Sequence, residues 1–376
     1  MNILVSGAGL AGLALALDLG GRGHHVTVVE RANHFRVNGS PIDVRGDALD
    51  IADRMGLLAK IRENRVRATE LSVFVDADGH EIGQMPVNEF DDSDHDIEIA
   101  REDLAQIMID ALPAGVDIRL QEHIESLADD GAGVDVRFAS GDTGRFDLLL
   151  GADGQHSAVR RLAFGPEQDY LRHLGLYVAV AELAGEERAD RLNPVYNFPG
   201  HMATIWRYKD KALAGFAFRS DLLRYDHHDL DAQKRILVDA FAGHTEWKIP
   251  QLLDAASADP ELYLDSVSQI RMPSWHRGRI ALVGDAASCA TLLSGRGTSL
   301  ALTGAWFLAE ELDRAGGDHT VAFERYETRQ RPYVDFAQNS VADTSELLVP
   351  SSWESINART RRINQVVDGG LPTRSM

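Results

Sequence analysis

A glycine-rich turn near the start of the chain restricts its fold more than any other feature. The apolar run 2–6 leads into the sequence Gly7-Ala8-Gly9-Leu10-Ala11-Gly12, a helical pattern follows as far as Gly21, and a second apolar run occupies 25–30. Strand, turn, helix and strand within about thirty residues form a βαβ unit, whose strands are parallel. Continuous apolar runs are typical of strands buried on both faces. The sequence therefore predicts an α/β fold with a parallel sheet.

The same turn predicts that the chain binds a dinucleotide. Gly7 permits a tight turn, Gly9 lets a pyrophosphate approach the backbone, and Gly12 lets the helix pack closely on the strand. The N-terminus of the helix offers N–H groups to phosphates. Glu30 ends the second strand, where an acid holds a ribose 2′-hydroxyl and repels a 2′-phosphate, so we expect NAD or FAD here rather than NADP. The alternative is a glycine turn that serves packing alone.

The composition is that of a globular protein of more than one domain. The chain has 376 residues, which fits two or more domains of about 150 residues each. Its 38 basic and 58 acidic residues give a net charge of −20. So acidic a chain is repelled by nucleic acid and by anionic membranes, and neither is an expected partner.

Cysteine and histidine usage predicts neither a disulfide nor a metal site. The single cysteine, Cys289, has no partner for an intramolecular disulfide or a cysteine-based metal site. The pairs His24-His25 and His227-His228 lack the spacing of zinc ligands. Since no apolar stretch is long enough to span a bilayer and the N-terminus lacks a basic leader, we expect a cytoplasmic protein.

Further along the chain, strand-rich stretches interrupt the α/β pattern. An Asp78-Gly79 turn within 71–83 predicts a hairpin. The remaining strands are expected at 116–120, 134–138, 146–150, within 175–218 and at 279–284. Helices are expected at 101–112, 231–242, 250–256, from the strand at 279–284 through Leu312, 320–343 and 353–367. This order predicts one nucleotide-binding domain interrupted by a β-rich domain.

Three motifs in order resemble one enzyme family. After the glycine turn come an Arg-x-x-Leu helix at Arg101 and Leu104, the sequence Gly-Ala-Asp-Gly at 151–154, and Gly-Asp-Ala-Ala at 284–287. Together they resemble the single-component, FAD-dependent aromatic hydroxylases, the family of para-hydroxybenzoate hydroxylase. The length of the chain and the segment 39–45 are most similar to the short branch that modifies tetracyclines and polyketides.

The resemblance implies a definite organisation. A Rossmann-type FAD-binding domain would comprise 1–72, 98–165 and 272–345. A β-sheet substrate-binding domain would comprise 73–97 and 166–271, and a C-terminal helix and tail would occupy 346–376. It also implies a monomer.

The resemblance further implies which residues hold the cofactor. Asp285 would bind a ribityl hydroxyl of FAD, although an aspartate there could instead cap the next helix. Asp153 with Gly154 would touch FAD and NAD(P)H, although Asp153 could be a plain turn residue. Arg101 would reach the pyrophosphate or ribityl chain, and Arg45 the flavin or NAD(P)H.

The loop Gly295-Arg296-Gly297 would open a helix whose N–H groups face the pyrimidine edge of the flavin and stabilise the anionic reduced form. The full predicted cofactor-binding set is Gly7, Gly9, Leu10, Ala11, Gly12, Glu30, Arg31, Arg45, Arg101, Leu104, Asp153, Gly154, Asp285, Gly295, Gly297, Thr298 and Ser299.

The chain departs from the family where a proline pair usually precedes this glycine loop. Here the segment 288–293 reads Ser-Cys-Ala-Thr-Leu-Leu. We therefore expect a differently shaped surface beside the flavin. Cys289 in this segment is interpreted as a small buried hydrophobic residue.

Aromatic residues concentrate in the strands at 175–218 and have two interpretations. They pack a sheet core, or they floor a pocket for a flat apolar substrate. The pocket candidates are Tyr177, Trp206, Phe216 and Phe218. Strand register decides between the two.

The reaction implied by the resemblance is hydroxylation of an aromatic or polycyclic phenolic substrate, such as a polyketide or a tetracycline. NADPH or NADH would bind transiently and reduce a tightly but non-covalently bound FAD, and a C4a-hydroperoxyflavin formed with O2 would transfer one oxygen atom. No catalytic acid or base is required by the sequence. Two alternatives stay open: a flavin-dependent dehydrogenase without oxygen insertion, and a non-catalytic nucleotide-binding protein.

Overall fold

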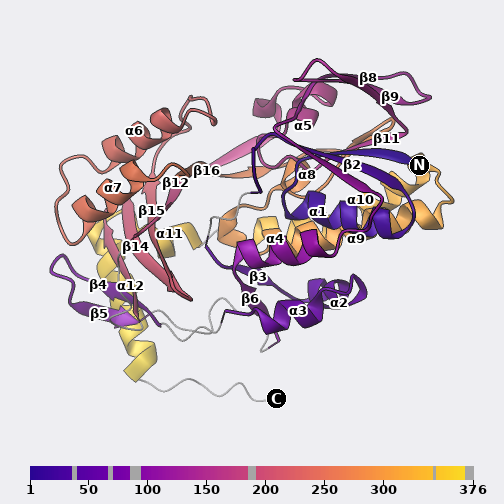
Figure 1. Cartoon of the computed structure of the whole chain (residues 1–376). Helices are drawn as coiled ribbons and strands as arrows, with labels where there is room; N and C mark the ends of the chain where they lie inside the picture. The colour runs from indigo at the N-terminus through magenta and orange to yellow at the C-terminus, as the bar shows by residue number, and fades with distance from the viewer. Residues whose placement is uncertain (36–39, 67–70, 85–94, 185–191, 342–343, 369–376) are drawn as a thin grey trace.

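The computed structural model describes residues 1–35, 40–66, 71–84, 95–184, 192–341 and 344–368. Two large sheets dominate these residues, and Figure 1 shows them on opposite sides of the molecule. A six-stranded sheet carries the glycine turn, and a seven-stranded sheet carries the aromatic-rich strands.

The six-stranded sheet has the order β17-β18-β11-β1-β2-β7. Its strands are β1 (Asn2–Ser6), β2 (His25–Glu30), β7 (Val116–Leu120), β11 (Leu148–Gly151), β17 (His276–Arg277) and β18 (Ile280–Leu282). All neighbouring pairs are parallel except β17 with β18. The parallel sheet expected from the βαβ pattern is therefore confirmed. Its centre is dry, since every residue of β11 is buried.

Helices from both ends of the chain cover this sheet. The helices of this half are α1 (Leu10–Gly21), α2 (Asp47–Arg54), α3 (Leu58–Glu63), α4 (Arg101–Asp110), α5 (Ala158–Ala163), α8 (Asp285–Ser288), α9 (Gly297–Arg314) and α10 (His319–Asn339). Helix α9 packs against α1 and α10, so the start and the end of the chain share one core.

Two small sheets complete this half of the molecule. One pairs β3 (Ile42–Val44) with β6 (Ile97–Ile99). The other joins β8 (Ile124–Asp129), β9 (Val134–Phe138) and β10 (Thr143–Phe146). The first lies against α9 and places Arg45 beside the start of that helix.

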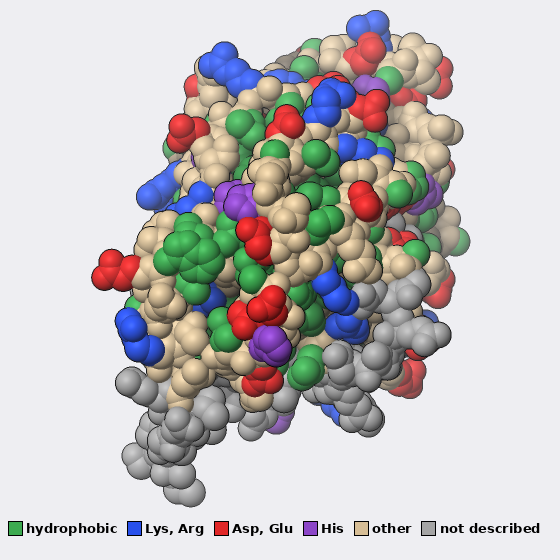
Figure 2. Space-filling view, turned by 90° about the vertical axis from the view of Figure 1, so that its left-hand side faces the viewer, with side chains coloured by type: hydrophobic (Ala, Val, Ile, Leu, Met, Phe, Trp, Pro, Cys, Tyr) green, Lys and Arg blue, Asp and Glu red, His purple; other side chains and the backbone are tan. Residues whose placement is uncertain are grey.

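The seven-stranded sheet has the order β16-β12-β15-β14-β13-β4-β5. Its strands are β4 (Leu71–Val75), β5 (Glu81–Gln84), β12 (Leu171–Glu182), β13 (Leu192–Phe198), β14 (His201–Tyr208), β15 (Lys211–Arg219) and β16 (Tyr263–Ile270). Helices α6 (Leu230–Ala240) and α7 (Ile249–Ala258) cover its outer face (Figure 1). Acidic and basic side chains are interspersed on that side of the molecule (Figure 2).

One expected helix is wrong. The chain does not continue as a single helix from the strand near 280 through Leu312. Instead α8 stops at Ser288, a 3-10 turn spans Leu292–Ser294, and α9 begins at Gly297. Thr291 and Gly295 both have positive φ, +74° and +60°, which no α-helix tolerates. The helix expected at 320–343 spans His319–Asn339, and Asp343 lies outside the described residues.

The C-terminal helices α11 (Thr344–Leu348) and α12 (Trp353–Asp368) dock on the seven-stranded sheet. Buried Arg359 of α12 donates to Asn197 Oδ1 (2.9 Å) on β13 and to the Leu347 carbonyl (2.8 Å). Its guanidinium also lies 3.8 Å from the centre of the Phe74 ring. Among the described residues, none of the helices is both long enough and apolar enough to cross a membrane.

We predict that Arg359→Leu loosens α12 from the sheet. The change leaves the buried oxygen of Asn197 without its donor, which costs about 2 kcal/mol of unfolding free energy. Urea unfolding measures the loss, and limited proteolysis should cut α12 first. The exposed Arg361→Leu serves as the control and should leave both unchanged; equal behaviour of the two variants would refute the anchor.

Candidate active site

The glycine turn joins β1 to α1 through contacts that only glycine permits. Gly7 has φ +100°, and a methyl group there would lie 2.5 Å from the Ala152 oxygen. A methyl group on Gly12 would lie 1.9 Å from the Gly7 oxygen. A methyl group on Gly9 would meet nothing within 4 Å. Gly7 and Gly12 are therefore needed for packing, whereas Gly9 faces open space at the N-terminus of α1.

Glu30 braces this turn from the end of β2. Its two carboxylate oxygens accept hydrogen bonds from the N–H groups of Ala8 and Ala32, each at 2.9 Å. The neighbouring Arg31 is exposed. Glu30 therefore fixes the loop geometry, and its predicted ribose contact stays a prediction.

Asp153 follows β11 and lies directly against the glycine turn. A methyl group on Gly7 would lie 2.8 Å from its Cα. Its carboxylate accepts hydrogen bonds from the Ser157 hydroxyl (2.5 Å) and from the N–H groups of Ala158 (2.8 Å) and Val159 (3.1 Å). Burial raises the pKa of Asp153, and these donors oppose the rise. The carboxylate is thus engaged at the start of α5, and its predicted contact with FAD or NAD(P)H stays a prediction.

Asp285 is the first residue of α8, at the carboxyl end of β18. Gly284 takes the N-cap position, so the structure does not show Asp285 as the cap of this helix. A methyl group on Gly284 would lie 2.8 Å from Ala11 Cβ. The Asp285 side chain is exposed. Desolvation nevertheless raises its pKa, and the charge of Arg101 opposes the rise. The Asp285 carboxylate is therefore accessible but incompletely solvated.

Arg101 and Leu104 both belong to α4 but differ in placement. Arg101 is exposed and its charge reaches Asp285. Leu104 is fully buried in the core of the six-stranded sheet. Leu104 therefore has no surface for a cofactor and orients the helix that carries Arg101.

The start of α9 meets strand β3. The N–H of Arg45 donates to Ser299 Oγ (2.9 Å), and the Arg45 guanidinium pairs with Asp43 (2.8 Å). A methyl group on Gly295 would lie 3.8 Å from that guanidinium. A cavity of about 350 Å³ opens beside this contact, between Arg45, Ser299, Tyr333 and other residues of α2, α9 and α10.

Thr291 stands in the segment where the aromatic hydroxylases usually have prolines. Its φ of +74° and ψ of 152° are far from the φ of about −65° that a proline ring requires. The side chain is 5% exposed, and its hydroxyl has no hydrogen-bond partner among the described residues. The expected difference in loop shape is therefore a difference in the backbone itself.

Three of the four pocket candidates lie in the sheet core, because strand register turns them away from the uncovered face. Tyr177, Phe216 and Phe218 are at most 3% exposed and lie in the core under α6 and α7. The Tyr177 hydroxyl accepts a hydrogen bond from the Leu223 N–H (2.8 Å). Trp206 lies on the opposite face and is half-buried.

The sequence reasoning missed Tyr263, the first residue of β16. It is 45% exposed, yet burial raises its pKa well above the usual value, and the charges of Asp265, Arg101 and Asp285 act on it. Its side chain therefore lies within electrostatic reach of Asp285 and Arg101. The signal that could have found it is the alternation Tyr263-Leu264-Asp265, which places two polar-tipped side chains on one face of a strand.

Comparisons with known proteins agree with this arrangement. A family model described as an FAD binding domain matches residues 1–174. A flavin-dependent monooxygenase of Legionella longbeachae is 34% identical over 370 residues, which cover 98% of this chain and 94% of the relative. The chain belongs to the FAD-dependent monooxygenases.

Other relatives of this monooxygenase cover almost the whole chain. An uncharacterised Mycobacterium tuberculosis protein is 40% identical over 352 residues, 91% of this chain and 93% of the relative. The crystal structure of the tetracycline destructase Tet(51) matches with a TM-score of 0.85 and 33% identity, over 100% of this chain and 99% of that one. The predicted family and fold class are confirmed.

We predict opposite effects of substitution at two glycines of this monooxygenase. Gly9→Val should change the unfolding free energy by less than about 1 kcal/mol, since its side chain meets open space, but weaken FAD binding at least about tenfold by blocking phosphate approach. Gly12→Ala should cost about 3 kcal/mol or more through its clash with Gly7. Urea unfolding and FAD titration separate the two.

Gly21→Ala is the control for both, because a methyl group there also meets nothing within 4 Å and the residue lies at the far end of α1. It should leave FAD affinity unchanged. A Gly9→Val protein that retains FAD as the control does would contradict the assignment of the open space to phosphate.

We also predict that Thr291→Gly leaves the protein as stable as before or stabilises it by about 1 kcal/mol, because glycine tolerates positive φ. The control Thr328→Gly, at an exposed position inside α10, should cost at least about 0.3 kcal/mol, the difference in helix propensity between threonine and glycine. Thermal unfolding compares them, and a larger loss at 291 than at 328 would refute the strain.

Proposed function

We propose that this monooxygenase uses NAD(P)H and O2 to hydroxylate an aromatic or polycyclic phenolic substrate. Its membership of the FAD-dependent monooxygenases supports the flavin chemistry. The observation that carries the proposal is that the glycine turn packs against the Gly284-Asp285 turn. The two are so close that a methyl group added to Gly284 would lie 2.8 Å from Ala11 Cβ. This contact places the open space at Gly9 and the accessible carboxylate of Asp285 on adjoining loops.

The residues present fit FAD. The N–H groups at the start of α1 would hold the pyrophosphate over Gly9, with Leu10 and Ala11 supplying backbone donors. Glu30 would accept from the adenosine ribose, and Asp285 would accept from a ribityl hydroxyl. Because the Asp285 carboxylate is accessible and poorly solvated, a ligand hydroxyl that donates to it would supply a hydrogen bond that water provides only weakly there.

The start of α9 would face the redox-active ring. Gly297, Thr298 and Ser299 present N–H groups without an acidic residue in the first turn, so the positive end of the helix favours an anion. FAD supplies the hydride acceptor and the oxygen chemistry when it is bound. The chain's part is to orient the ring, exclude water and stabilise negative charge at the helix end.

The substrate would lie against the face of the seven-stranded sheet that α6 and α7 leave uncovered. Trp206 and Tyr263 lie on this face, the second within reach of the charges of Asp285 and Arg101. An aromatic ring stacked there would be flat against apolar surface, with polar groups at its edge. The structural likeness to a tetracycline destructase supports a polycyclic substrate.

The other proposals concern organisation. We propose that the FAD-binding domain comprises 1–72, 98–165 and 272–345 and that the substrate domain comprises 73–97 and 166–271. Strand β4 begins at Leu71, so its first two residues fall on the FAD-domain side of the boundary between 72 and 73. We further propose that NADPH or NADH binds transiently and that the chain acts as a monomer.

One observation favours a second candidate function. Thr291 gives the loop that would lie beside the flavin a backbone that proline cannot adopt. A reshaped loop changes access of O2 to the ring, so a flavin-dependent dehydrogenase without oxygen insertion is the alternative. Isotopically labelled O2 distinguishes them, because only the monooxygenase transfers label to the product.

We predict that purified protein is yellow, with absorbance maxima at about 370 and 450 nm. Some aromatic compounds should also accelerate its NAD(P)H consumption. The product of such a compound should gain about 16 Da, one oxygen atom. Asp285→Asn should weaken FAD binding about tenfold, because an amide accepts less strongly from a hydroxyl than a carboxylate does. A protein that takes up no FAD would end the proposal.

A further inference from the structure

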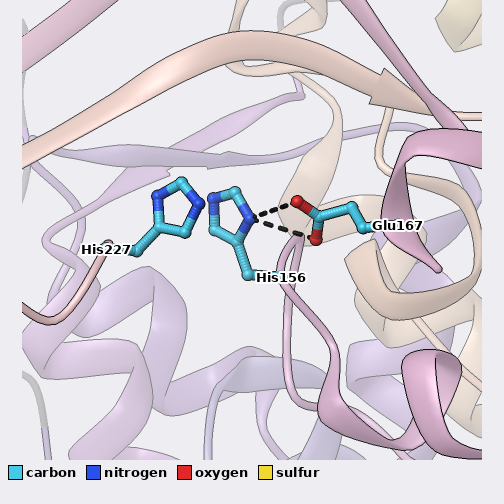
Figure 3. Close-up of side chains that lie close together, drawn as sticks. All are labelled: His156, Glu167 and His227. Carbon is cyan, nitrogen blue, oxygen red and sulfur yellow. Dashed lines mark hydrogen bonds and ion pairs between the residues drawn. The ribbon is translucent and has the colours of Figure 1, made fainter. Parts of the chain in front are cut away.

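His156 joins the loop after β11 to the other half of the molecule. It lies three residues beyond Asp153 and two beyond Gly154. Its Nδ1 contacts the carboxylate of Glu167 at 3.0 Å, and its Nε2 contacts that of Asp265 at 3.0 Å. Figure 3 shows the ring between Glu167 and the parallel ring of His227, whose centre is 3.5 Å away.

A histidine with a carboxylate at each ring nitrogen is protonated, since both nitrogens must donate. Burial lowers its pKa, but the hydrogen bonds to Asp265 and Glu167 outweigh that effect and raise the pKa of His156 to about 9. The stacked His227 has its pKa lowered by burial and by the charge of His156, so only one ring of the pair is charged at neutral pH.

The charges of this cluster are balanced without a metal ion. Glu167 also accepts a hydrogen bond from the fully buried guanidinium of Arg160 (2.9 Å). Two carboxylates therefore face one imidazolium and one guanidinium. A divalent cation would need a ring nitrogen with a free lone pair and an excess of negative charge, and His156 in this arrangement offers neither.

Asp265 also binds the residue next to His156. Its Oδ1 accepts from Gln155 Nε2 (3.3 Å), and Gln155 Oε1 accepts from the Cys289 thiol (3.4 Å). Cys289 is the C-cap that follows α8, the helix that begins with Asp285. One carboxylate on β16 thus holds the Asp153 loop and, through Gln155, the end of α8.

We propose that His156 is a positioning residue: its paired contacts with Asp265 and Glu167 fix the Asp153-Gly154 loop and the neighbouring α8 in the arrangement that binds FAD. The inference rests on the proposed function for the FAD site. It assigns no chemical step to His156. Asp265 comes from β16, Glu167 from the turn before β12, and His227 from the loop before α6, so the clamp spans the two sheets.

Its pH dependence has a definite sign. The pKa of His156 is raised from 6.5 to about 9, so the stabilisation is complete below pH 6.5 and is lost as pH rises through about 9. The carboxylates of Glu167 and Asp265 face the His156 ring, and the guanidinium of Arg160 lies behind Glu167. The titratable ring of His227 stacks on the His156 ring. FAD affinity should fall over the same range.

The test measures the FAD dissociation constant by flavin fluorescence, and the stability of the FAD-free protein, from pH 6 to pH 10. In the natural protein we expect FAD affinity to fall about tenfold as pH rises through about 9. His156→Gln should bind FAD about tenfold more weakly at pH 7 and show no alkaline fall. His156→Arg keeps a cation with several donors and should restore affinity at pH 7 and hold it to pH 10.

His276→Gln is the matched control. His276 is 22% exposed against 21% for His156 and also contacts a carboxylate, Glu327 at 3.7 Å, but it lies on the edge strand β17. It should reproduce the natural pH profile. Should His156→Gln not fold, the profile of the natural protein and that of His156→Arg decide the question.

An unchanged profile in His156→Gln, or a His156→Arg protein as weak and as pH-sensitive as His156→Gln, would overturn the inference. Failure of the proposed function looks different, because the natural protein would then bind no FAD at any pH. The alkaline loss of stability in the FAD-free protein, present in the natural chain and absent in His156→Gln, still tests the clamp in that case.

Discussion

The contact between Gly7 and Gly12 is the constraint on which the rest of the structure depends. A methyl group at position 12 would lie 1.9 Å from the Gly7 oxygen, so α1 can pack against β1 only without a side chain there. The same turn presses against Ala152 and Asp153, and α1 presses against Gly284 through Ala11. Loops from three strands therefore meet through backbone atoms and the Cβ of Ala11, which has no rotamers. Because backbone contacts leave no rotamer freedom, they fix the positions of the loops that carry Asp153 and Asp285 before any ligand arrives.

Much of this framework could be predicted from the sequence because it rests on local signals. Continuous apolar runs identified β1, β2, β11 and β18 of the six-stranded sheet but not its edge strand β17, and Asp78-Gly79 identified the hairpin of β4 and β5, where Gly79 has φ +86°. The path between α8 and α9 could not be predicted in this way. Thr291 is a β-branched residue in a conformation that favours glycine, and only the surrounding packing, which buries its side chain, can enforce that conformation.

The site residues divide along the same line. The positions of Gly9, Asp285 and Ser299 follow from motif and strand order, whereas the orientation of the aromatic residues depends on register. Tyr177 and Tyr263 look equivalent in the sequence, yet the first lies in the core and the second is 45% exposed. A shift of one residue along a strand exchanges its faces, and no local signal sets that register. Pairings such as His156 with Asp265, which are 109 residues apart, are likewise set by the fold alone.

The site's carboxylates differ in how far the protein itself satisfies them, and this difference orders their roles. Glu30 and Asp153 each accept at least two hydrogen bonds from within the chain, so they hold loops whether or not a ligand is present. Asp285 is accessible, and desolvation raises its pKa. A hydroxyl that donates to it stabilises the ionised form, so ligand binding and ionisation of Asp285 are thermodynamically linked. The two engaged carboxylates thus set the shape of the site, and the least satisfied one gains most from a bound ligand.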